Sequence, residues 1–215
     1  MSESIRFLYE GGKGEIEVKK SRFLAELAPV TTEEEANAFI AAKKKEFWDA
    51  RHNCHAFIVG EKPEILRFSD DGEPGGTAGK PMLEILQHEG LHDVVVVVTR
   101  YFGGVLLGTG GLVRAYQGAV QEALPACRFG QRFTGQEIDI LLPYTLLGKI
   151  QHFLRERSGV FELETIYEQD VTVKLVTPVS EKDALCQGIK DLLGGQAGLT
   201  IKDPDSYDEV DGKII

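Results

Sequence analysis

The most apolar stretch of the chain is a run of five valines, Val94 to Val98. The run shows no alternation of apolar and polar positions, so it predicts a strand that is covered on both faces. It is far shorter than the roughly 20 apolar residues that a membrane-spanning helix needs. We therefore expect this strand at the centre of a sheet inside a globular domain.

The segment after the valines combines glycines with a helical repeat of apolar residues. Thr99-Arg100-Tyr101 leads into Gly103-Gly104, and a second glycine run covers 108–111. Apolar residues then recur at helical spacing, which predicts a helix with one buried stripe. The start of such a helix has unpaired backbone N–H groups and a partial positive charge, so it is suited to bind an anion. The predicted stripe consists of Leu112, Ala115, Tyr116, Ala119, Ala123 and Leu124.

The chain before the valines predicts strands and one helix. Residues 4–10 and 14–28 are expected to form a strand pair around Gly11-Gly12, and residues 15–18 alternate between polar and apolar as a half-exposed strand does. A capping box that begins at Thr32 predicts the start of a helix. The lysines at 43–45 fall near the end of this helix, where we expect a solvated face.

A second glycine-rich loop, SDDGEPGGTAGKP at 69–81, follows a strand expected at 64–68 and leads into another helix. It is not a Walker P-loop, because Pro74 occupies the first glycine position and a proline follows the lysine. The other glycine run, 108–113, lacks the last glycine of G-x-G-x-x-G, so it gives a dinucleotide-binding fold little support.

The loop at 69–81 also concentrates polar side chains. Its three carboxylates could hold Mg²⁺ or act as acid and base. They could equally accept hydrogen bonds from the N–H groups of the turn, as acidic residues beside glycine commonly do. The residues concerned are the carboxylates Asp70, Asp71 and Glu73, the hydroxyl of Thr77 and the cation Lys80.

Two histidines and a cysteine introduce the strand expected at 56–59. On a period of two, His52 and Cys54 share a face and His55 takes the opposite one, so a three-ligand metal site is geometrically awkward. We expect one imidazole to support the neighbouring loop by hydrogen bonding. The sequence therefore predicts no metal site, and no cofactor is implied.

Composition narrows the class of protein without naming a function. The net charge of −10 argues against wholesale coating by nucleic acid, but it does not exclude a local basic site. Residues 1–130 hold 15 Lys and Arg against 19 Asp and Glu, and residues 131–215 hold 9 against 15. The three cysteines are widely spaced and include no C-x-x-C pair, which argues against disulfides. With no signal-peptide pattern at the N-terminus, we expect a cytoplasmic protein with no membrane association.

A break in the pattern at 125–135, marked by proline and glycine, predicts a domain boundary, with one domain at 1–130 and another at 131–215. The second domain predicts the order β-α-β-β-α-β of a ferredoxin-like fold. The expected elements are a strand at 136–142, a helix at 146–157, strands at 160–167 and 170–177, a helix at 181–193 and a strand at 199–202.

Two long motifs of the first domain closely resemble the signature of the Impact family. Residues 69–82 read SDDGEPGGTAGKPM, and residues 94–116 read VVVVVTRYFGGVLLGTGGLVRAY. Two motifs of this length at this separation make the match specific. The resemblance covers residues 15–125, and the second domain is similar in pattern to one found only in the bacterial two-domain branch of the family.

The resemblance implies an α+β protein. Its N-terminal domain would be an α/β sandwich similar to domain 2 of ribosomal small-subunit protein five. The C-terminal ferredoxin-like domain would be similar to the last domain of translocase elongation factor G. Eukaryotic relatives regulate translation by competing for an activator of the amino-acid-starvation kinase, but they usually carry a different partner domain, which this chain lacks.

Three functions remain open at this point. The first is a non-catalytic nucleic-acid-binding or ribosome-associated protein linked to translation, with RNA or the ribosome as its partner. The two glycine loops would then meet in one anion-binding cleft, and aromatic side chains would stack on bases. The expected anion-binding residues are Thr77, Lys80, Arg100, Gly110, Gly111 and Arg114, and the expected stacking residues are Tyr101 and Phe102.

The second function is regulation of translation or of a stress response through a protein partner, bound by an apolar patch near Tyr101 and Phe102. The third is an enzyme acting on a phosphorylated or other anionic small molecule. The carboxylates at 70–73 would then hold a metal or act as a base. A purely structural alternative pairs Arg100 and Arg114 with those same carboxylates.

Overall fold

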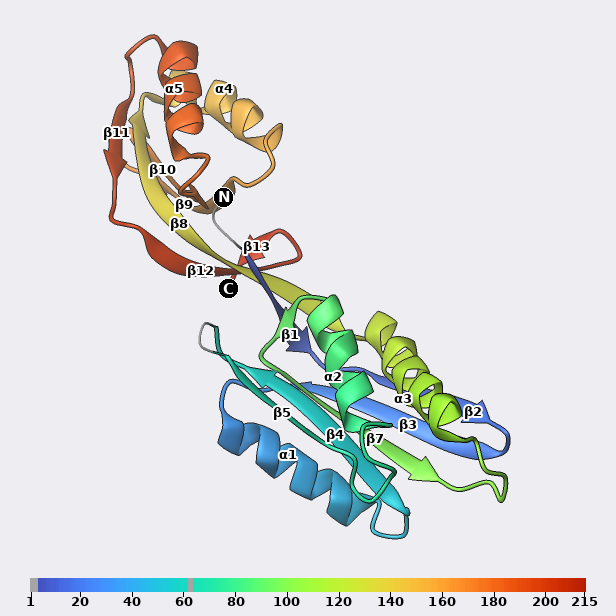
Figure 1. The fold of residues 1–215 in the computed structure, drawn as a ribbon. Coiled ribbons are helices and arrows are strands. Elements are labelled where there is room, and N and C mark those ends of the chain that lie inside the picture. The colour runs from blue at the N-terminus through green and yellow to red at the C-terminus, as the bar shows by residue number, and fades with distance from the viewer. Residues whose placement is uncertain (1–3, 62–63) are drawn as a thin grey trace. The chain divides into compact units, whose positions relative to one another are not determined.

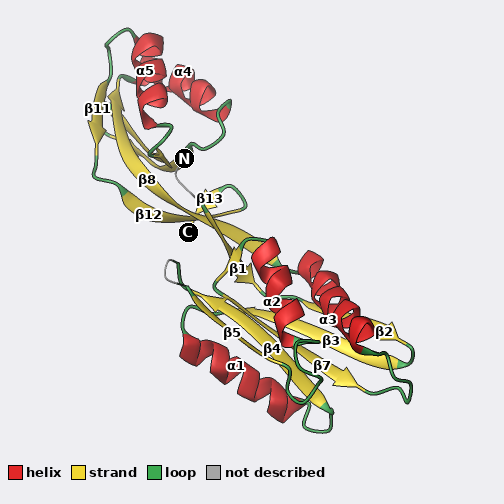
Figure 2. Ribbon diagram, viewed as in Figure 1, coloured by secondary structure: helices red, strands yellow, loops and turns green. Residues whose placement is uncertain are grey.

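A computed structural model of the chain describes residues 4–61 and 64–215 (Figures 1 and 2). The chain divides into two compact units. We call residues 5–130 the N-terminal unit, and residues 131–215, with which Ser4 is grouped, the C-terminal unit. The first three residues of the predicted domain 1–130 lie outside the described residues. Helices and strands occur in both units, which confirms the predicted α+β class.

The N-terminal unit is built on a five-stranded sheet with the order β2-β3-β7-β4-β5. Its central strand is β7, and β3 and β4 pair with it in antiparallel fashion on either side. The elements of the unit are β1 (Ile5–Glu10), β2 (Lys13–Val18), β3 (Ser21–Pro29), α1 (Glu33–Glu46), β4 (His52–Val59), β5 (Ile65–Ser69), α2 (Gly79–His88), β6 (Leu91–His92), β7 (Val94–Tyr101), α3 (Thr109–Ala123) and the short 3₁₀ helix η1 (Leu124–Ala126).

The valine run lies in the middle of this sheet and is covered on both faces, as predicted. Val94, Val96 and Val98 belong to the core under α2 and α3. Val95 and Val97 belong to a second core under α1, on the opposite face (Figure 1). All five side chains are at most 1% exposed, which explains why the run has no polar alternation.

Two of the helices follow the sequence expectations closely. The hydroxyl of Thr32 accepts a hydrogen bond from the N–H of Glu35 at 3.1 Å, so the predicted cap starts α1. The buried stripe of α3 contains five of the six residues predicted. Leu124 lies instead in η1, where it is half-buried, and Val120 takes a place in the stripe.

The lysines at the end of α1 differ from the expected solvated face. Lys43 is buried and forms ion pairs with Glu26 and Glu46 at 2.7 and 2.8 Å. Burial alone would lower the pKa of Lys43, but the hydrogen bonds to the two carboxylates outweigh it and raise the pKa. The prediction was wrong here because a charge run shows the helix position of a lysine but not the carboxylate that the sheet brings beneath it.

The first strands also differ from the prediction. β1 pairs in parallel with β6 and not with the strand that follows it in the chain. The stretch 14–28 contains two strands, β2 and β3, separated by a turn at Lys19 and Lys20. Both lysines have positive φ values, 48° and 66°. Lysine is not a residue that signals such a turn, so the turn could not be predicted from the residues that form it.

The C-terminal unit contains the predicted order β-α-β-β-α-β. β8 pairs with β10 and β11, β10 pairs with β9, and all of these pairs are antiparallel. Buried residues of α4 and α5 form one core with β8 and β10. The elements are β8 (Arg128–Leu142), α4 (Tyr144–Arg155), β9 (Phe161–Tyr167), β10 (Val171–Pro178), α5 (Lys182–Leu193), β11 (Gly198–Ile201), β12 (Asp205–Val210) and β13 (Lys213–Ile214).

Two features of β8 and of the C-terminal unit were not predicted. The stretch 125–135, expected to interrupt secondary structure, contains the beginning of β8, which runs unbroken from Arg128 to Leu142. The acidic tail forms β12 and β13, and β12 pairs with β8. Arg132 binds both carboxylate oxygens of Asp208, at 2.7 and 2.8 Å, which helps to hold β12 in place.

Candidate functional site

The two glycine-rich loops line one cavity in the N-terminal unit. Its volume is about 400 Å³, within the range typical of small-ligand sites. The lining comes from the loop between β5 and α2, from the loop between β7 and α3 with the first turn of α3, and from residues at the start of β4 and the end of β7. The residues that line this loop cavity are Arg51, His52, Gly72, Glu73, Pro74, Arg100, Phe102, Leu106, Leu107, Gly108, Thr109 and Leu112.

Asp70 holds the first loop together. Its carboxylate accepts hydrogen bonds from the backbone N–H groups of Gly76, Ala78 and Gly79 at 2.8, 3.0 and 2.8 Å. Two of these N–H groups lie at the start of α2, which has no other side-chain cap. Asp70 thus has the capping role that was one of the two alternatives for the carboxylates.

Asp71 connects the loop to β4 and α1. Its carboxylate accepts hydrogen bonds from the N–H of Asn53 at 2.7 Å and from the ammonium of Lys44 at 2.6 Å. Its carbonyl oxygen lies 2.8 Å from Nδ1 of His52, which must therefore carry the hydrogen and donate it. The predicted loop support by an imidazole is thus provided by His52. Burial alone would raise the pKa of Asp71, but the hydrogen bonds from Lys44 and Asn53 lower it.

Glu73 forms a buried ion pair beneath the cavity. Its Oε1 accepts hydrogen bonds from Nη1 of Arg100 at 2.6 Å and from the hydroxyl of Tyr116 at 2.8 Å. The side chains of Glu73 and Arg100 are only 4% and 6% exposed. Arg100 is therefore paired, as the structural alternative proposed. The three carboxylates of the loop have separate partners and do not converge on one point.

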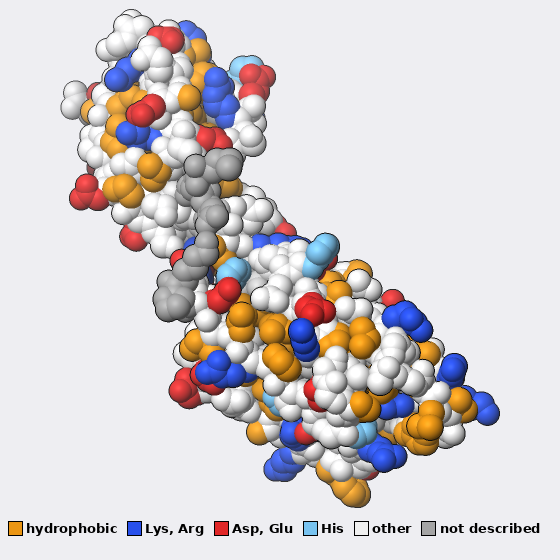
Figure 3. All heavy atoms as spheres, in the orientation of Figure 1, with side chains coloured by type: hydrophobic (Ala, Val, Ile, Leu, Met, Phe, Trp, Pro, Cys, Tyr) orange, Lys and Arg blue, Asp and Glu red, His pale blue; other side chains and the backbone are white. Residues whose placement is uncertain are grey.

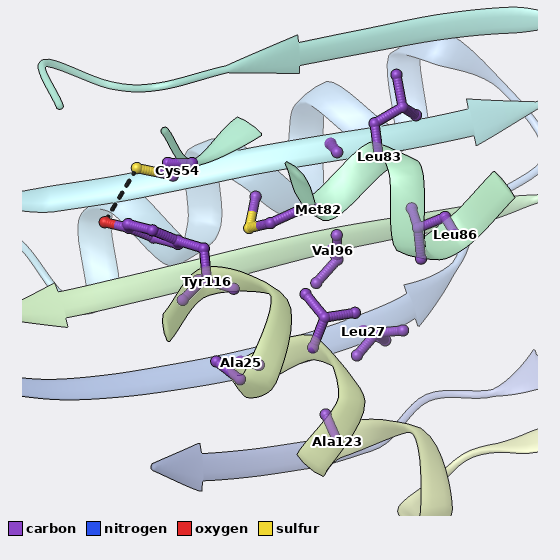
Figure 4. Close-up of a cluster of buried hydrophobic side chains, with 14 of the residues drawn as sticks. Ala25, Leu27, Cys54, Met82, Leu83, Leu86, Val96, Tyr116 and Ala123 are labelled. Carbon is purple, nitrogen blue, oxygen red and sulfur yellow. Dashed lines mark hydrogen bonds between the residues drawn. The ribbon is translucent and has the colours of Figure 1, made fainter. Parts of the chain in front are cut away.

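A thiol and a phenol extend this network into the core. Sγ of Cys54 lies 3.3 Å from the hydroxyl of Tyr116 (Figure 4). It also lies 3.0 Å from the carbonyl oxygen of Asp70. Burial raises the pKa of Cys54 to about 12 and also raises that of Tyr116. Both groups stay protonated at neutral pH, so the thiol is not poised as a nucleophile.

None of the remaining predicted anion-binding residues is among those that line the loop cavity. The hydroxyl of Thr77 is buried and donates to the carbonyl oxygen of Pro74 at 2.6 Å. Gly110 and Gly111 lie in the first turn of α3. Lys80 and Arg114 are exposed, and neither lines the cavity. The structure therefore brings together only part of the predicted set.

The two aromatic candidates have different environments. The hydroxyl of Tyr101 donates to Asp49 at 2.9 Å. Phe102 lines the loop cavity, is 41% exposed and has two guanidinium groups near its ring. The Cζ atoms of Arg51 and Arg100 are 5.9 and 5.5 Å from the centre of its ring.

Arg51 was missed as a site residue. It precedes β4, whose first residue, His52, pairs with Arg100 across the sheet. The glycines and carboxylates that mark the site in the sequence lie in the two loops, and Arg51 lies outside both. It comes to the site only because β4 pairs with β7. An expected pairing of β4 with the valine strand would have placed Arg51 beside Arg100, and that was the available signal.

Two kinds of feature are absent from the described residues, 4–61 and 64–215. No group of three or more His, Cys, Asp or Glu side chains there is arranged to hold a metal ion. None of the helices in that part of the chain is long and apolar enough to cross a membrane.

Comparisons with known proteins match both units. The model of the Impact N-terminal domain matches residues 19–124, and a domain of unknown function, DUF1949, matches residues 140–196. The chain is 42% identical to the IMPACT family member YvyE of Bacillus subtilis over 88% of this chain and 87% of that protein. It is 40% identical to the IMPACT family member YigZ of Escherichia coli over 77% of this chain and 81% of that protein.

A solved structure gives the same result. The crystal structure of a hypothetical protein with 35% sequence identity covers 94% of this chain and 99% of its own, with a TM-score of 0.59. The similarity to YvyE and YigZ extends over most of each protein and includes both glycine loops of the N-terminal unit. The chain therefore belongs to the IMPACT family, as its two motifs predicted.

Proposed function

We propose that this protein is a non-catalytic RNA-binding, ribosome-associated protein linked to translation, and that it binds RNA phosphates at the loop cavity. One observation carries the proposal, namely that two glycine loops distant in the sequence line the same cavity with the start of a helix and two arginines. The link to translation comes from the family resemblance.

The polar groups of the cavity suit an anion. α3 begins at Gly108, which has no side chain to cap the helix, and the first turn contains no acidic residue. The free backbone N–H groups in the first turn of α3 therefore carry the partial positive charge of the helix end. Arg51, which also lines the cavity, adds a full positive charge. The charge of −10 on the whole chain makes such a local concentration of donors necessary for binding RNA.

The rim of the cavity suits bases. Phe102 and Leu106, which both line the cavity, are 41% and 82% exposed. Exposed aromatic rings beside cations are the usual means by which proteins hold single-stranded RNA. Figure 3 shows lysine and arginine side chains beside hydrophobic ones over the end of the N-terminal unit where α3 begins.

The test measures the binding of labelled tRNA and ribosomal RNA fragments over a series of salt concentrations. We expect affinity to fall steeply with salt and Arg51→Ala to reduce the slope by about 0.7, the value for one phosphate contact on a single strand. Phe102→Ala is expected to weaken binding by about 1–3 kcal/mol with the slope unchanged.

Arg155→Ala is the matched control, because Arg155 is an exposed arginine of α4 in the other unit. It removes the same charge and is expected to leave affinity and slope unchanged. The double variant Lys80→Ala, Arg114→Ala shows whether these two cations, which do not line the cavity, contribute to the affinity for RNA. Absence of RNA binding by the unmodified protein at low salt would refute the proposal.

A protein partner is the second candidate, because the exposed side chains of Trp48, Phe102, Val105 and Leu106 also suit an apolar interface. Such an interface would bind with little dependence on salt, since its charges contribute less than its buried apolar area. A translation factor captured equally well at low and high salt, and lost in Leu106→Ser, would favour this function over RNA binding.

A further inference from the structure

We propose that His52 makes the loop cavity specific for RNA over DNA, because its Nε2 accepts a hydrogen bond from a ribose 2′-hydroxyl. This inference rests on the proposed function and adds which nucleic acid the cavity accepts. It depends on the tautomer of His52, on the lack of a partner for Nε2 among the described residues, and on the polar groups that line the cavity.

The tautomer of His52 is fixed by the first glycine loop. Nδ1 lies 2.8 Å from the carbonyl oxygen of Asp71, which can only accept, so Nδ1 carries the hydrogen. In the neutral ring Nε2 then holds the lone pair and can only accept. A Cβ at Gly72 would lie 3.5 Å from Nδ1, so the loop covers this edge of the ring and leaves the Nε2 edge for the cavity that His52 lines.

Nε2 of His52 has no hydrogen-bond partner in the described part of the chain. It lies 3.9 Å from Oε1 of Glu73, which is too far for a hydrogen bond. His52 is only 8% exposed, but its Nε2 is not sealed from solvent as Nε of Arg100 is. Polar groups in such a buried side chain almost always have a partner, so an unpartnered acceptor that opens onto a cavity indicates a ligand that supplies a donor.

The carboxylate of Glu73 adds a second acceptor beside His52. Oε1 already accepts hydrogen bonds from Arg100 and Tyr116, whereas Oε2 has no hydrogen-bond partner among residues 4–61 and 64–215. Like Nε2 of His52, this oxygen is not sealed from solvent. Both side chains line the cavity. A phosphodiester has no hydrogen to donate to either acceptor, so a ligand that fits the cavity must also bring an O–H or N–H group.

The 2′-hydroxyl of RNA meets this requirement. It is bonded to the ribose carbon next to the one that carries the 3′-phosphate, so the hydroxyl and the phosphate can enter the same cavity of about 400 Å³. Arg51 and Thr109 line the cavity with donors for the phosphate, and His52 and Glu73 line it with acceptors for the hydroxyl. DNA has no hydroxyl at this position and would leave both acceptors unpaired.

The experiment compares three forms of one short single-stranded oligouridine, which contain ribose, 2′-deoxyribose or 2′-fluororibose and carry identical bases. The 2′-fluoro form keeps a sugar shape close to that of RNA but cannot donate a hydrogen bond, so it separates the loss of the hydroxyl from a change in the shape of the strand. Affinity for the full-length protein is measured by fluorescence anisotropy at low salt. We expect the ribose form to bind about threefold to tenfold more tightly than either of the others, as the loss of one hydrogen bond requires.

Two variants of His52 test whether Nε2 causes the preference. Asparagine places an amide N–H near the position of Nδ1, so His52→Asn keeps a donor to Asp71 and removes the acceptor. Glutamine places its amide oxygen near the position of Nε2, so His52→Gln keeps an acceptor. We expect His52→Asn to bring the affinities for the three forms within about twofold of one another, and His52→Gln to keep part of the preference. A purely structural role of His52 would change all three affinities by the same factor.

His92→Asn is the matched control, because Nδ1 of His92 also lies near a backbone carbonyl, that of Gly60 at 3.1 Å, but His92 does not line the cavity. It is expected to leave the preference intact. Equal affinity of the unmodified protein for the three forms would overturn this inference and leave RNA binding in place, whether or not the variants fold. A preference unchanged in His52→Asn would also overturn it. No binding of any form at low salt would overturn both proposals.

Discussion

Asp70 shows how one side chain can hold the shape of a functional loop. Its carboxylate accepts three backbone hydrogen bonds, and two of the donors, Ala78 and Gly79, are buried. Buried donors that lose their acceptor are costly, so Asp70→Ala is expected to lower the free energy of unfolding by about 2–4 kcal/mol. Urea denaturation measures the loss. Asp70→Asn keeps one side-chain oxygen, so its free energy of unfolding should fall by less. A decrease below about 0.5 kcal/mol in Asp70→Ala would contradict the role of Asp70 in holding the loop.

Asp71 makes a contribution to stability that depends on pH. Because its pKa is lowered in the folded state, its contribution is present above the unfolded pKa and is lost as pH falls through the folded value. The stability difference between the unmodified protein and Asp71→Asn should therefore be about 1–2 kcal/mol at pH 7 and shrink below pH 4. Asparagine tolerates the φ of 44° at this position, so the substitution tests the charge without adding backbone strain.

The partner of Asp71 provides the matching variants. Lys44→Met removes the ion pair at 2.6 Å and should reproduce part of the loss at pH 7. Lys45 is the next residue of the same helix and is exposed, so Lys45→Met removes an equal charge without touching Asp71. Chemical denaturation from pH 3 to pH 8 compares the four proteins. A stability difference that is constant over this range would show that the charge of Asp71 contributes nothing.

At the scale of elements, the segment that follows β7 passes close to the β2–β3 turn, and this explains one glycine of the motif. A Cβ at Gly103 would lie 2.0 Å from the carbonyl carbon of Lys20, so Gly103→Ala forces the backbone to move. We expect the free energy of unfolding to fall by about 3 kcal/mol or more, measured by urea denaturation.

Gly110 is the contrasting position. A Cβ there would meet nothing closer than Nη1 of Arg114 at 3.9 Å. Gly110→Ala should therefore be neutral or stabilising by up to about 1 kcal/mol, and equal losses in the two variants would contradict this account.

Elements with a strong local signal were predictable. The valine strand, the cap of α1 at Thr32 and the stripe of α3 each depend on residues that are near one another in the chain. The turn at Lys19 and Lys20 and the parallel pair of β1 with β6 were not predictable. A turn without glycine or asparagine carries no signal, and a pair formed by a strand of two residues is decided by packing around it.

At the scale of the whole molecule, the family and the α+β class followed from two motifs and one pattern of elements. The presence of two polar loops was predictable, because glycine, proline and acidic residues mark them. The residues with which the side chains of these loops pair were not predictable. The pairing of Arg100 with Glu73 joins residues 27 apart, and the arrival of Arg51 depends on the register of β4 against β7. Long-range pairing of this kind is set by the packed sheet and not by local sequence.

The central position of β7 also dictates an order of events during synthesis. The partners of β7, β3 and β4, leave the ribosome before it, and until then each has an unpaired edge. About 35 residues separate the end of β4 from the start of β7, which takes roughly 2–7 s at ordinary elongation rates. During this interval the growing chain holds two half-sheets without the strand that joins them. Unpaired strand edges can pair with other chains and aggregate, so we expect chaperones to bind the nascent chain during this interval.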